Sequence, residues 1–235
     1  MKMKKILSVI LLFAMLALSL SSCGAPDYCE YAQTRDTEGR NIHYVEIKVK
    51  DYGKITVLLD ATTAPITVAN FLGLVESGFY NGLKLHRVII DFMIQGGDPN
   101  GDGTGGAEKE IIGEFSKNGF DNDISHKRGV ISMARSQSYN SASSQFFICN
   151  ADSTGLDGEY AAFGYVVQGM RVVDKITKDV FPKTYLADLY GNFSYHPYYG
   201  KTYHELWQKL GNGALEKDED KPVIEYIKVL ENYEG

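Results

Sequence analysis

The chain has 235 residues, of which 44% are hydrophobic and 23% charged, and it carries a formal net charge of −6. This length allows one domain or at most two small ones, and one domain with a globular core is the better fit once the ends are discounted. Residues 1–22 hold three lysines and no acidic residue, so the remainder has 21 basic and 30 acidic side chains, a formal charge of −9. That acidic balance argues against a nucleic-acid partner and against a purely electrostatic membrane contact.

Residues 1–22 have the pattern of an export signal. Three lysines among the first five residues precede an apolar run over 6–20, and two serines separate this run from Cys23. A basic start, an apolar core of this length and small residues before the cut are typical of a signal peptide rather than a spanning helix. The ending LSSC also resembles a bacterial lipoprotein signal, in which the cysteine is acylated; the alternative is an ordinary secretory peptide. We therefore expect a lipoprotein anchored through Cys23 to the outer face of a bacterial cell membrane.

The next part of the chain is predicted to lead into a hairpin and a helix. Residues 23–41 are polar and lack periodicity, as expected for a flexible tether. Apolar and charged residues then alternate over 43–50, and an apolar segment over 54–59 follows a turn, so the two segments form a hairpin. Pro65 opens the first helix, which ends at Gly78. Apolar residues recur at helical spacing within it: Ile66, Ala69, Leu72 and Val75.

Short strands dominate the rest of the chain. Two apolar strands, 85–90 and 92–95, precede a long glycine-rich region over 98–127. Irregular segments of that length inside a compact domain are usually functional. Further elements are predicted at 129–134, 145–149, 162–167 and 170–177, of which 170–177 is a helix and the others are strands. Short strands with two helices indicate a closed barrel or a sandwich.

Six sequence blocks stand in a fixed order along this part of the chain. They are HRVI at 86–89, FMIQGGDP at 92–99, GTGG at 103–106, ISMAR at 131–135, SQFFI at 144–148 and LDGEYAAFG at 156–164. Together they resemble the cyclophilin family of peptidyl-prolyl cis/trans isomerases, and the resemblance runs over roughly 44–178 with a last strand near 223–230. It implies a mainly β fold, a closed eight-stranded antiparallel barrel capped by two helices, in a domain over residues 42–235.

The resemblance also implies a reaction and the residues that perform it. The reaction is rotation about X-Pro bonds in proline-containing peptides and in unfolded, exported or cell-envelope proteins, without a cofactor or metal. Arg87 matches the arginine whose permanent charge stabilises the prolyl nitrogen of the twisted amide, and Gln95 matches the glutamine that holds the substrate's carbonyl side. The proline pocket matches Phe92, Met93, Phe147 and Leu156, with Tyr160 beside it, and the wall for the preceding residue matches Ala134 and Gln145. We expect a monomer.

Strand alternation sets a condition on this groove. Along residues 92–95 it places Phe92 and Ile94 on one face and Met93 and Gln95 on the other. A groove that contains both Phe92 and Gln95 therefore needs the end or the twist of the strand to bring them together.

Three positions depart from the best-known eukaryotic family pattern. Gly155 stands where those relatives have a tryptophan beside the proline pocket, Tyr160 replaces a pocket histidine and Arg135 replaces an asparagine. Loss of the indole removes a large apolar wall and an N–H donor. We therefore expect weak cyclosporin binding and a reduced or altered peptide preference. Arg135 and Tyr160 resemble the bacterial branch of the family.

Two other motifs are present only in outline. Gly101, Gly103 and Gly106 have the GxGxxG spacing of dinucleotide sites, but no βαβ unit surrounds them. Asp98 begins the first half of a calcium-binding loop, but Lys109 stands where a bidentate glutamate is needed. No CxxC pair or histidine cluster supports a zinc site. We therefore expect neither a dinucleotide nor a metal.

Several single residues have two interpretations. Cys149 in the apolar run FFIC is most simply a buried, inert thiol rather than half of a catalytic dyad, and no GxSxG elbow marks a nucleophilic serine. His86 is interpreted as a structural histidine, either in the core or hydrogen-bonded. For Arg87 the alternative to the catalytic role is a surface ion pair with a nearby carboxylate. Cys29 lies in the polar tether, where no disulfide partner is predicted.

Residues 179–222 form an insertion relative to the compact family pattern. Within it, residues 202–210 are a candidate short helix. The insertion is rich in aromatic residues, namely Tyr185, Tyr190, Tyr195, Tyr198, Tyr199, Tyr203 and Trp207. These aromatics either pack the insertion onto the barrel or form an extra surface that binds client proteins.

Two other functions compete with catalysis. One is a binding module that holds extended or unfolded exported chains without turnover, and the other is an envelope scaffold in which the insertion matters more than the groove. Arg87, Phe92 and Gln95 favour the enzyme, because holding a chain would not need a charge over the prolyl nitrogen.

Overall fold

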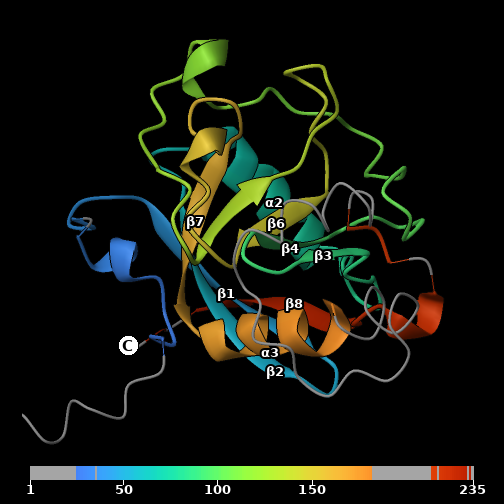
Figure 1. Cartoon of the computed structure of the whole chain (residues 1–235). Coiled ribbons are helices and arrows are strands. Elements are labelled where there is room, and N and C mark those ends of the chain that lie inside the picture. Colours follow the sequence, from blue (N-terminus) through green and yellow to red (C-terminus); the bar gives the residue numbers. More distant parts are fainter. Residues whose placement is uncertain (1–24, 35, 182–212, 216, 232, 234–235) are drawn as a thin grey trace, which may run out of the picture.

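The computed structural model describes residues 25–34, 36–181, 213–215, 217–231 and 233, and its helices and strands follow the predicted order (Figure 1). The strands are β1 (Ile42–Val49), β2 (Gly53–Asp60), β3 (Arg87–Ile89), β4 (Met93–Gly96), β5 (Val130–Met133), β6 (Phe146–Cys149), β7 (Ala162–Gln168) and β8 (Ile224–Leu230). The α-helices are α2 (Pro65–Glu76) and α3 (Met170–Phe181), and short 3-10 helices occur at η1 (Glu30–Thr34), η2 (Ser116–Asn118), η3 (Thr154–Leu156) and η5 (Asp218–Asp220). The predicted signal, the anchor at Cys23 and most of the predicted insertion lie outside the described residues.

All eight strands form one antiparallel sheet in the order β3-β4-β6-β5-β7-β2-β1-β8. The sheet is curled but open, so the prediction of a closed barrel is wrong. Among the described strands, β3 and β8 are the two edges and share no ladder. The edges approach through a bridge between Lys84 and Val223 and through a bond from the Leu85 N–H to the Pro222 carbonyl, 2.8 Å. Because the segment facing β8 is irregular and β3 itself has only three residues, no ladder closes the gap.

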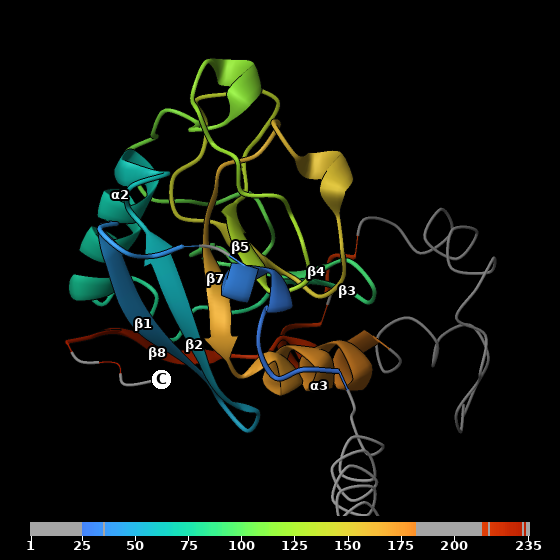
Figure 2. The same ribbon diagram turned by 90° about the vertical axis from the view of Figure 1, so that its left-hand side faces the viewer.

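The two α-helices cover different ends of the curled sheet, as the views in Figure 1 and Figure 2 show. Helix α2 packs against β2 and β8, and helix α3 packs against β2 and β3. Helix α3 continues past its predicted end at Thr177. The face of the sheet formed by β3, β4 and β6 therefore has α3 near one end and the irregular segments of the glycine-rich region around the other.

Helix α2 begins at Pro65 as predicted, and of the four apolar residues at helical spacing Leu72 and Val75 pack toward the core while the other two lie toward solvent. Ile66 is 39% exposed and Ala69 is exposed, whereas the buried residues are Thr67, Val68, Phe71 and Val75. The cause is Glu114, whose buried carboxylate accepts bonds from the Ile66 N–H, the Thr67 N–H and the Thr67 hydroxyl at 2.7–3.0 Å. Because a carboxylate that satisfies first-turn N–H groups stabilises a helix start, it holds Thr67 inward.

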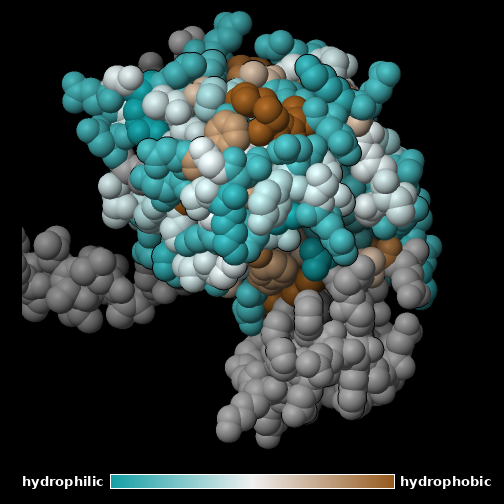
Figure 3. Space-filling view, turned by 90° about the horizontal axis from the view of Figure 1, so that it is seen from above, coloured by the Kyte–Doolittle hydropathy of each residue, from teal (hydrophilic) through white to brown (hydrophobic). Residues whose placement is uncertain are grey.

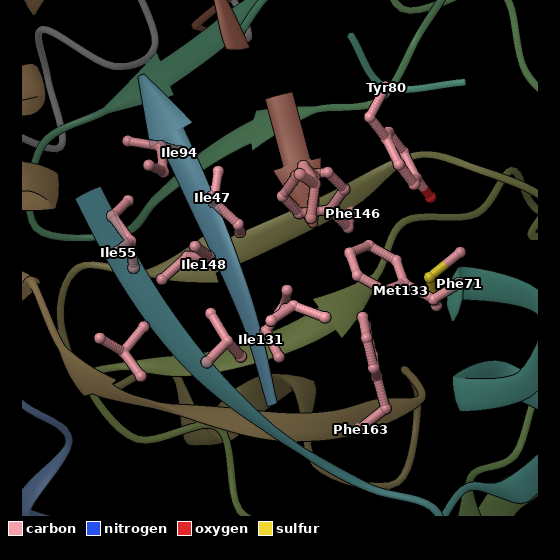
Figure 4. Close-up of a cluster of buried hydrophobic side chains, with 14 of the residues drawn as sticks. Ile47, Ile55, Phe71, Tyr80, Ile94, Ile131, Met133, Phe146, Ile148 and Phe163 are labelled. Atoms are coloured by element: carbon pink, nitrogen blue, oxygen red, sulfur yellow. The ribbon is translucent and has the colours of Figure 1, made fainter. Parts of the chain in front are cut away.

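The hydrophobic core lies between the inner face of the curled sheet and helix α2 (Figure 4). Rings from separate elements meet there: Phe71 of α2 lies edge-on to Phe146 of β6, with ring centroids 5.5 Å apart. The labelled core residues of the strands are Ile47, Ile55, Ile94, Ile131, Met133, Phe146, Ile148 and Phe163. Since side chains alternate along a strand, the neighbours of these residues point to the outer face of the sheet.

Part of the predicted tether belongs to the domain. Cys29 is fully buried, and its N–H donates to the Val166 carbonyl of β7 at 2.8 Å. Asp27 accepts bonds from the N–H groups of Met170 and Arg171 at the start of α3, at 2.9 and 2.6 Å. The prediction of a flexible tether is therefore wrong for this stretch, because a few anchoring side chains hold a segment whose average composition is polar.

The face of the molecule seen in Figure 3 is mainly hydrophilic, and hydrophobic residues gather in small areas of it. Three large hydrophobic side chains are exposed: Ile66, Ile112 and Tyr139. Within the described ranges, no helix is both long enough and apolar enough to cross a bilayer.

Candidate active site

The two predicted catalytic residues, Arg87 and Gln95, lie in a row of side chains that crosses four adjacent strands. Strand register pairs Arg87 of β3 with Gln95 of β4, Gln95 with Phe147 of β6, and Phe147 with Ser132 of β5. We call these four residues the active-site row. Ile94 and Phe146, their neighbours along β4 and β6, belong to the interior core, so the row lies on the outer face. The row begins with the charge of Arg87, and its far half holds the Phe147 ring followed by the Ser132 hydroxyl.

Phe92 joins this face because it lies before β4 rather than within it. Asp91 has a left-handed backbone, φ 55°, and the Phe92 N–H bonds back to the Ile89 carbonyl at 3.3 Å. Because of this turn, Phe92 does not follow the alternation of β4. It can therefore lie on the same face as Gln95, as a groove that contains both residues requires. The guanidinium carbon of Arg87 lies 5.9 Å from the centroid of the Phe92 ring.

The residues predicted for the proline pocket gather in a second hydrophobic cluster, apart from the interior core. We call it the pocket cluster. Its members are Ile89, Met93, Phe147 and Cys149, which are buried, and Phe92, Ala134, Leu156 and Tyr160, which are partly buried. Phe147 and Tyr160 meet edge to face, with centroids 6.0 Å apart. The structure thus brings together the pocket residues that the sequence blocks indicated.

A continuous series of hydrogen bonds, which we call the amide chain, holds Arg87. The Arg87 Nη1 donates to Gln95 Oε1 at 3.0 Å, and Gln95 Nε2 donates to Gln145 Oε1 at 2.9 Å. Gln145 Nε2 in turn donates to the carbonyls of Gly103 and Gly105, at 3.1 and 2.7 Å. The carbonyls of Gly103 and Gly105 can only accept, so the NH2 group of Gln145 must face them and its oxygen must face Gln95. The same argument turns the NH2 group of Gln95 toward Gln145 and its oxygen toward the Arg87 guanidinium.

The glycine-rich loop at the end of the amide chain is built around Asp98. This buried carboxylate accepts bonds from the N–H groups of Asn100, Asp102 and Gly103 at 2.6–3.1 Å. Burial alone would raise the pKa of Asp98, but these backbone bonds outweigh it and hold the pKa below its usual value. A side chain at Gly105 would overlap the Asp98 carboxylate, so glycine is required there. The residue that begins the calcium-loop pattern, Asp98, therefore stabilises its own loop by accepting backbone hydrogen bonds.

A segment within the predicted insertion, residues 213–215, extends the sheet beside Arg87. The Val88 N–H donates to the Gly213 carbonyl at 3.1 Å, and the Leu215 N–H donates to the His86 carbonyl at 2.8 Å. Leu215 is 3% exposed and packs into the interior core. A side chain at Gly213 would overlap Ile89, so only glycine allows this approach. Sequence reasoning missed this support of the catalytic strand, and the only local signal is an Asn-Gly pair at 212–213.

Arg135 stabilises the wall that carries Tyr160. Its guanidinium carbon lies 4.7, 5.1 and 5.3 Å from the ring centroids of Tyr160, Tyr139 and Phe115. Its Nε donates to the Glu159 carbonyl at 2.9 Å. A partly buried guanidinium in contact with three rings restricts the positions of all three. Arg135 therefore supports the pocket cluster from behind.

Comparison with known proteins identifies the family. A model of the family described as cyclophilin type peptidyl-prolyl cis-trans isomerase/CLD matches residues 44–186. The chain belongs to this family. It is 47% identical over 131 residues to peptidyl-prolyl cis-trans isomerase A of Dickeya dadantii, covering 54% of this chain and 67% of that protein. It is 44% identical over 135 residues to an isomerase of Helicobacter pylori strain J99, covering 57% of this chain and 80% of that protein. The enzyme class is therefore peptidyl-prolyl cis-trans isomerase.

Solved structures agree with this assignment. A cyclophilin type isomerase from Cryptosporidium parvum superposes with a TM-score of 0.60 and 25% identity, over 82% of this chain and all of that one. A second crystal structure of that protein, in the presence of the dipeptide Ala-Pro, has a TM-score of 0.59 and 26% identity, over 80% of this chain and 99% of that one. The mainly β cyclophilin fold with two helices is thus shared.

Three further residues of this cyclophilin can now be placed. His86 is 2% exposed, and neither ring nitrogen has a hydrogen-bond partner among the described residues, which supports the core interpretation. Burial lowers its pKa. Cys149 is fully buried in the pocket cluster, and burial raises the pKa of its thiol well above the usual value, as expected for an inert cysteine. Gly155 is exposed, and a Cβ there would meet no atom within 4 Å.

Proposed function

We propose that this cyclophilin rotates X-Pro bonds with Arg87 at the prolyl nitrogen and the proline ring in the pocket cluster. The observation that carries the proposal is the active-site row, which sets Arg87 and Phe147 on either side of Gln95. Neighbouring strands lie about 4.8 Å apart, so the charge and the aromatic ring are separated by roughly 10 Å. A prolyl residue bound across Gln95 would present its nitrogen to the charge and its ring to Phe147.

The chemistry needs no bond to be broken. Amide resonance creates a barrier of about 18–20 kcal/mol, and shortening the exchange time from tens of seconds to a millisecond requires roughly 6 kcal/mol of differential stabilisation. Twisting withdraws the nitrogen lone pair from resonance, which makes it a better acceptor in the transition state than in either planar form. Arg87 keeps its charge at any working pH, and the amide chain already orients it, so little reorganisation is required.

The proposed substrates are proline-containing peptides and exported or cell-envelope proteins. The Cryptosporidium relative, crystallised in the presence of Ala-Pro, supports a proline dipeptide as the smallest ligand. We assign the proline ring to Phe92, Met93, Phe147 and Leu156, with Tyr160 at the rim, and the preceding residue to the wall of Ala134 and Gln145. Gln95 would hold the carbonyl side of the substrate.

Exchange NMR on an X-Pro peptide tests the catalytic role of Arg87. The wild-type protein should accelerate exchange between the cis and trans signals, and Arg87→Ala should lower the rate by about a hundredfold or more. Arg87→Lys should recover only a small part, because an ammonium lacks the planar fork. An Arg87→Ala protein with an undiminished rate would refute the proposal.

A binding module without turnover is the second candidate. The observation that favours it is the open surface at Gly155, where the pocket lacks a wall beside the proline site. The same NMR experiment separates the two functions. Peptide binding by the wild type without accelerated exchange would place the holding function first.

Location and assembly form a separate part of the proposal. We propose export and acylation at Cys23, based on the LSSC ending of the first 23 residues. Labelled palmitate should enter the wild-type protein in a bacterial host and be absent from Cys23→Ala. Absence of label from the wild type would favour an ordinary secretory peptide.

We also propose that the protein acts as a monomer, since exposed large hydrophobic residues are few in the part of the chain that the structure describes. Sedimentation equilibrium should give the mass of one chain, and a dimer mass would contradict the proposal.

A further inference from the structure

Asp157 ties the turn that carries Leu156 to the segment before β5. One carboxylate oxygen, Oδ1, accepts bonds from the His126 N–H at 2.7 Å and from His126 Nδ1 at 2.9 Å. The other, Oδ2, accepts a bond from the Ser125 hydroxyl at 2.6 Å. The backbone adds a fourth link, since the Ser153 N–H donates to the His126 carbonyl at 2.7 Å. The turn that forms one wall of the pocket cluster is therefore held by residues about thirty positions earlier in the chain.

His126 connects this turn to the opposite wall. Its ring is fully buried and lies nearly parallel to the Phe147 ring, at 17° with centroids 6.0 Å apart. Its Nε2 lies 3.0 Å from the Ser132 hydroxyl, at the end of the active-site row. Because an ionised carboxylate can only accept, Nδ1 carries the proton and Nε2 accepts from Ser132. We call this series, Asp157–His126–Ser132, the turn link.

The turn link has the order of groups found in serine hydrolases, but its geometry excludes that chemistry. Ser132 is fully buried in the middle strands of the sheet, paired with Phe147 on one side. A nucleophilic oxygen must reach the reacting carbon of a bound substrate. The Ser132 hydroxyl cannot do so, and it is already the donor to His126. The turn link must therefore act through its neighbours, Phe147 and Leu156.

We propose that His126 and Asp157 are positioning residues that hold Leu156 and Phe147 at the separation that grips a proline ring. This inference rests on the proposed assignment of the pocket cluster to proline. The turn link and the amide chain share no residue, so loosening the pocket leaves the orientation of Arg87 unchanged. Loss of grip weakens planar and twisted substrate alike, which raises KM without lowering kcat.

The neutral state of His126 fits this role. Burial lowers the pKa of His126, and the nearby Asp157 carboxylate only partly opposes that effect. Burial would raise the pKa of Asp157, but its hydrogen bonds with His126 and Ser125 outweigh this and lower it. The carboxylate is thus ionised and the imidazole neutral at neutral pH, and every polar atom of the turn link has a partner.

Steady-state kinetics on a proline peptide, with the purified protein, test the proposal. Asp157→Ala should raise KM by about tenfold and leave kcat within about twofold. Asp157→Asn should recover part of the loss, because its amide oxygen still accepts one bond from His126. His126→Phe keeps a ring on Phe147 but removes both polar links, so it should match Asp157→Ala. In the double variant KM should rise no further, since both changes break the same connection.

Asp152→Ala is the matched control. Asp152 lies five positions before Asp157 in the same segment, but its carboxylate bonds to the Arg128 N–H and to Lys127, outside the pocket cluster. Its KM should equal that of the wild type. The inference would be overturned if Asp157→Ala lowered kcat at constant KM, in proportion to the loss of folded protein measured by circular dichroism. That result would mean that Asp157 has a merely structural role.

Leu156→Ala distinguishes failure of the inference from failure of the proposed pocket. If Leu156→Ala leaves KM unchanged, the pocket assignment itself is wrong. If Leu156→Ala raises KM but Asp157→Ala and His126→Phe do not, the pocket stands and the positioning role fails.

Discussion

The charged half of the active-site row and its aromatic half are supported by different parts of the chain. Arg87 is oriented by the amide chain, which ends on carbonyls of the glycine-rich loop. Phe147 and the pocket cluster are held by the turn link and by Arg135. The first support consists of neutral amides, and the second consists of aromatic and imidazole rings together with the charged groups of Asp157 and Arg135. This separation implies that transition-state stabilisation and proline binding can be altered independently.

Breaking the charged half should give the largest effect. Gln95→Leu removes both the acceptor for Arg87 and the donor to Gln145, so the guanidinium loses its fixed orientation. We expect kcat to fall by about a hundredfold, since removal of one preorganised group costs 10²- to 10³-fold in comparable sites. KM should change by less than about threefold. Steady-state kinetics on the same peptide as above provide the measurement.

The control for this change is Gln168→Leu. Gln168 is an exposed glutamine at the end of β7, away from the active-site row, and the same substitution there should leave kcat unchanged. A change confined to KM in Gln95→Leu would contradict the assignment of the amide chain to transition-state stabilisation.

Completing the aromatic half should give the next largest effect. Gly155→Trp restores an apolar wall at a position where a Cβ meets no atom within 4 Å and the backbone needs no glycine. We expect cyclosporin to bind about tenfold more tightly, from the apolar area and ring contacts that an indole adds. Titration calorimetry measures the affinity, with Gly155→Ala as the control that should bind like the wild type. Strong cyclosporin binding by the wild-type protein would contradict the expected role of Gly155.

Weakening the outer support of the aromatic half should have a smaller effect. Arg135→Met keeps much of the side-chain volume but removes three ring contacts and the bond to the Glu159 carbonyl. We expect the free energy of unfolding to fall by about 1 kcal/mol, because one cation–π or hydrogen-bond contact contributes about that much. Urea denaturation provides the measurement. Arg171→Met changes an exposed arginine on α3 and should have no effect.

The residues of both halves could be predicted from the sequence because they are contained in continuous blocks. Arg87 and Gln95 lie eight positions apart, and strand pairing brings them face to face. Phe147 follows from the block SQFFI, and Leu156 and Tyr160 follow from LDGEYAAFG. These three residues lie together in the pocket cluster. Their roles in binding stay predictions.

The supports of both halves could not be predicted, because they depend on contacts distant in sequence. His126 stands in the polar stretch ISHKRG, where nothing indicates a fully buried ring. The inward position of Thr67 in α2 depends on Glu114, 47 positions later, which helical periodicity could not indicate. Cys29 is likewise buried within a polar segment, because it packs against distant residues such as Val130 and Tyr165 and bonds to the backbone of β7. The closed barrel was wrong for a similar reason, since the gap between β3 and β8 depends on how two irregular segments meet.

Mild acidification should have the smallest effect, a decrease in the stability of the folded protein. It should also distinguish the two halves of the active-site row, because each half lies near a different buried histidine. His86 lies beside the glycine-rich loop and His126 in the turn link, and burial lowers the pKa of both. Each therefore binds its proton more readily in the unfolded chain than in the folded protein. Below the usual histidine pKa of about 6.5, stability should then fall with pH, by at most about 1.4 kcal/mol per pH unit for each proton.

The carboxylates Asp98 and Asp157 act in the same direction at lower pH. Their pKa values are lowered in the folded protein, so their contribution is complete above the unfolded pKa of about 3.9 and is lost as pH falls through the folded value. Urea denaturation at pH 7.5 and pH 5 should therefore show a decrease that comes from the histidines alone. His86→Phe should reduce this decrease and leave KM unchanged, whereas His126→Phe should reduce it and raise KM. Equal KM values in the two variants would mean that His126, like His86, contributes only to stability.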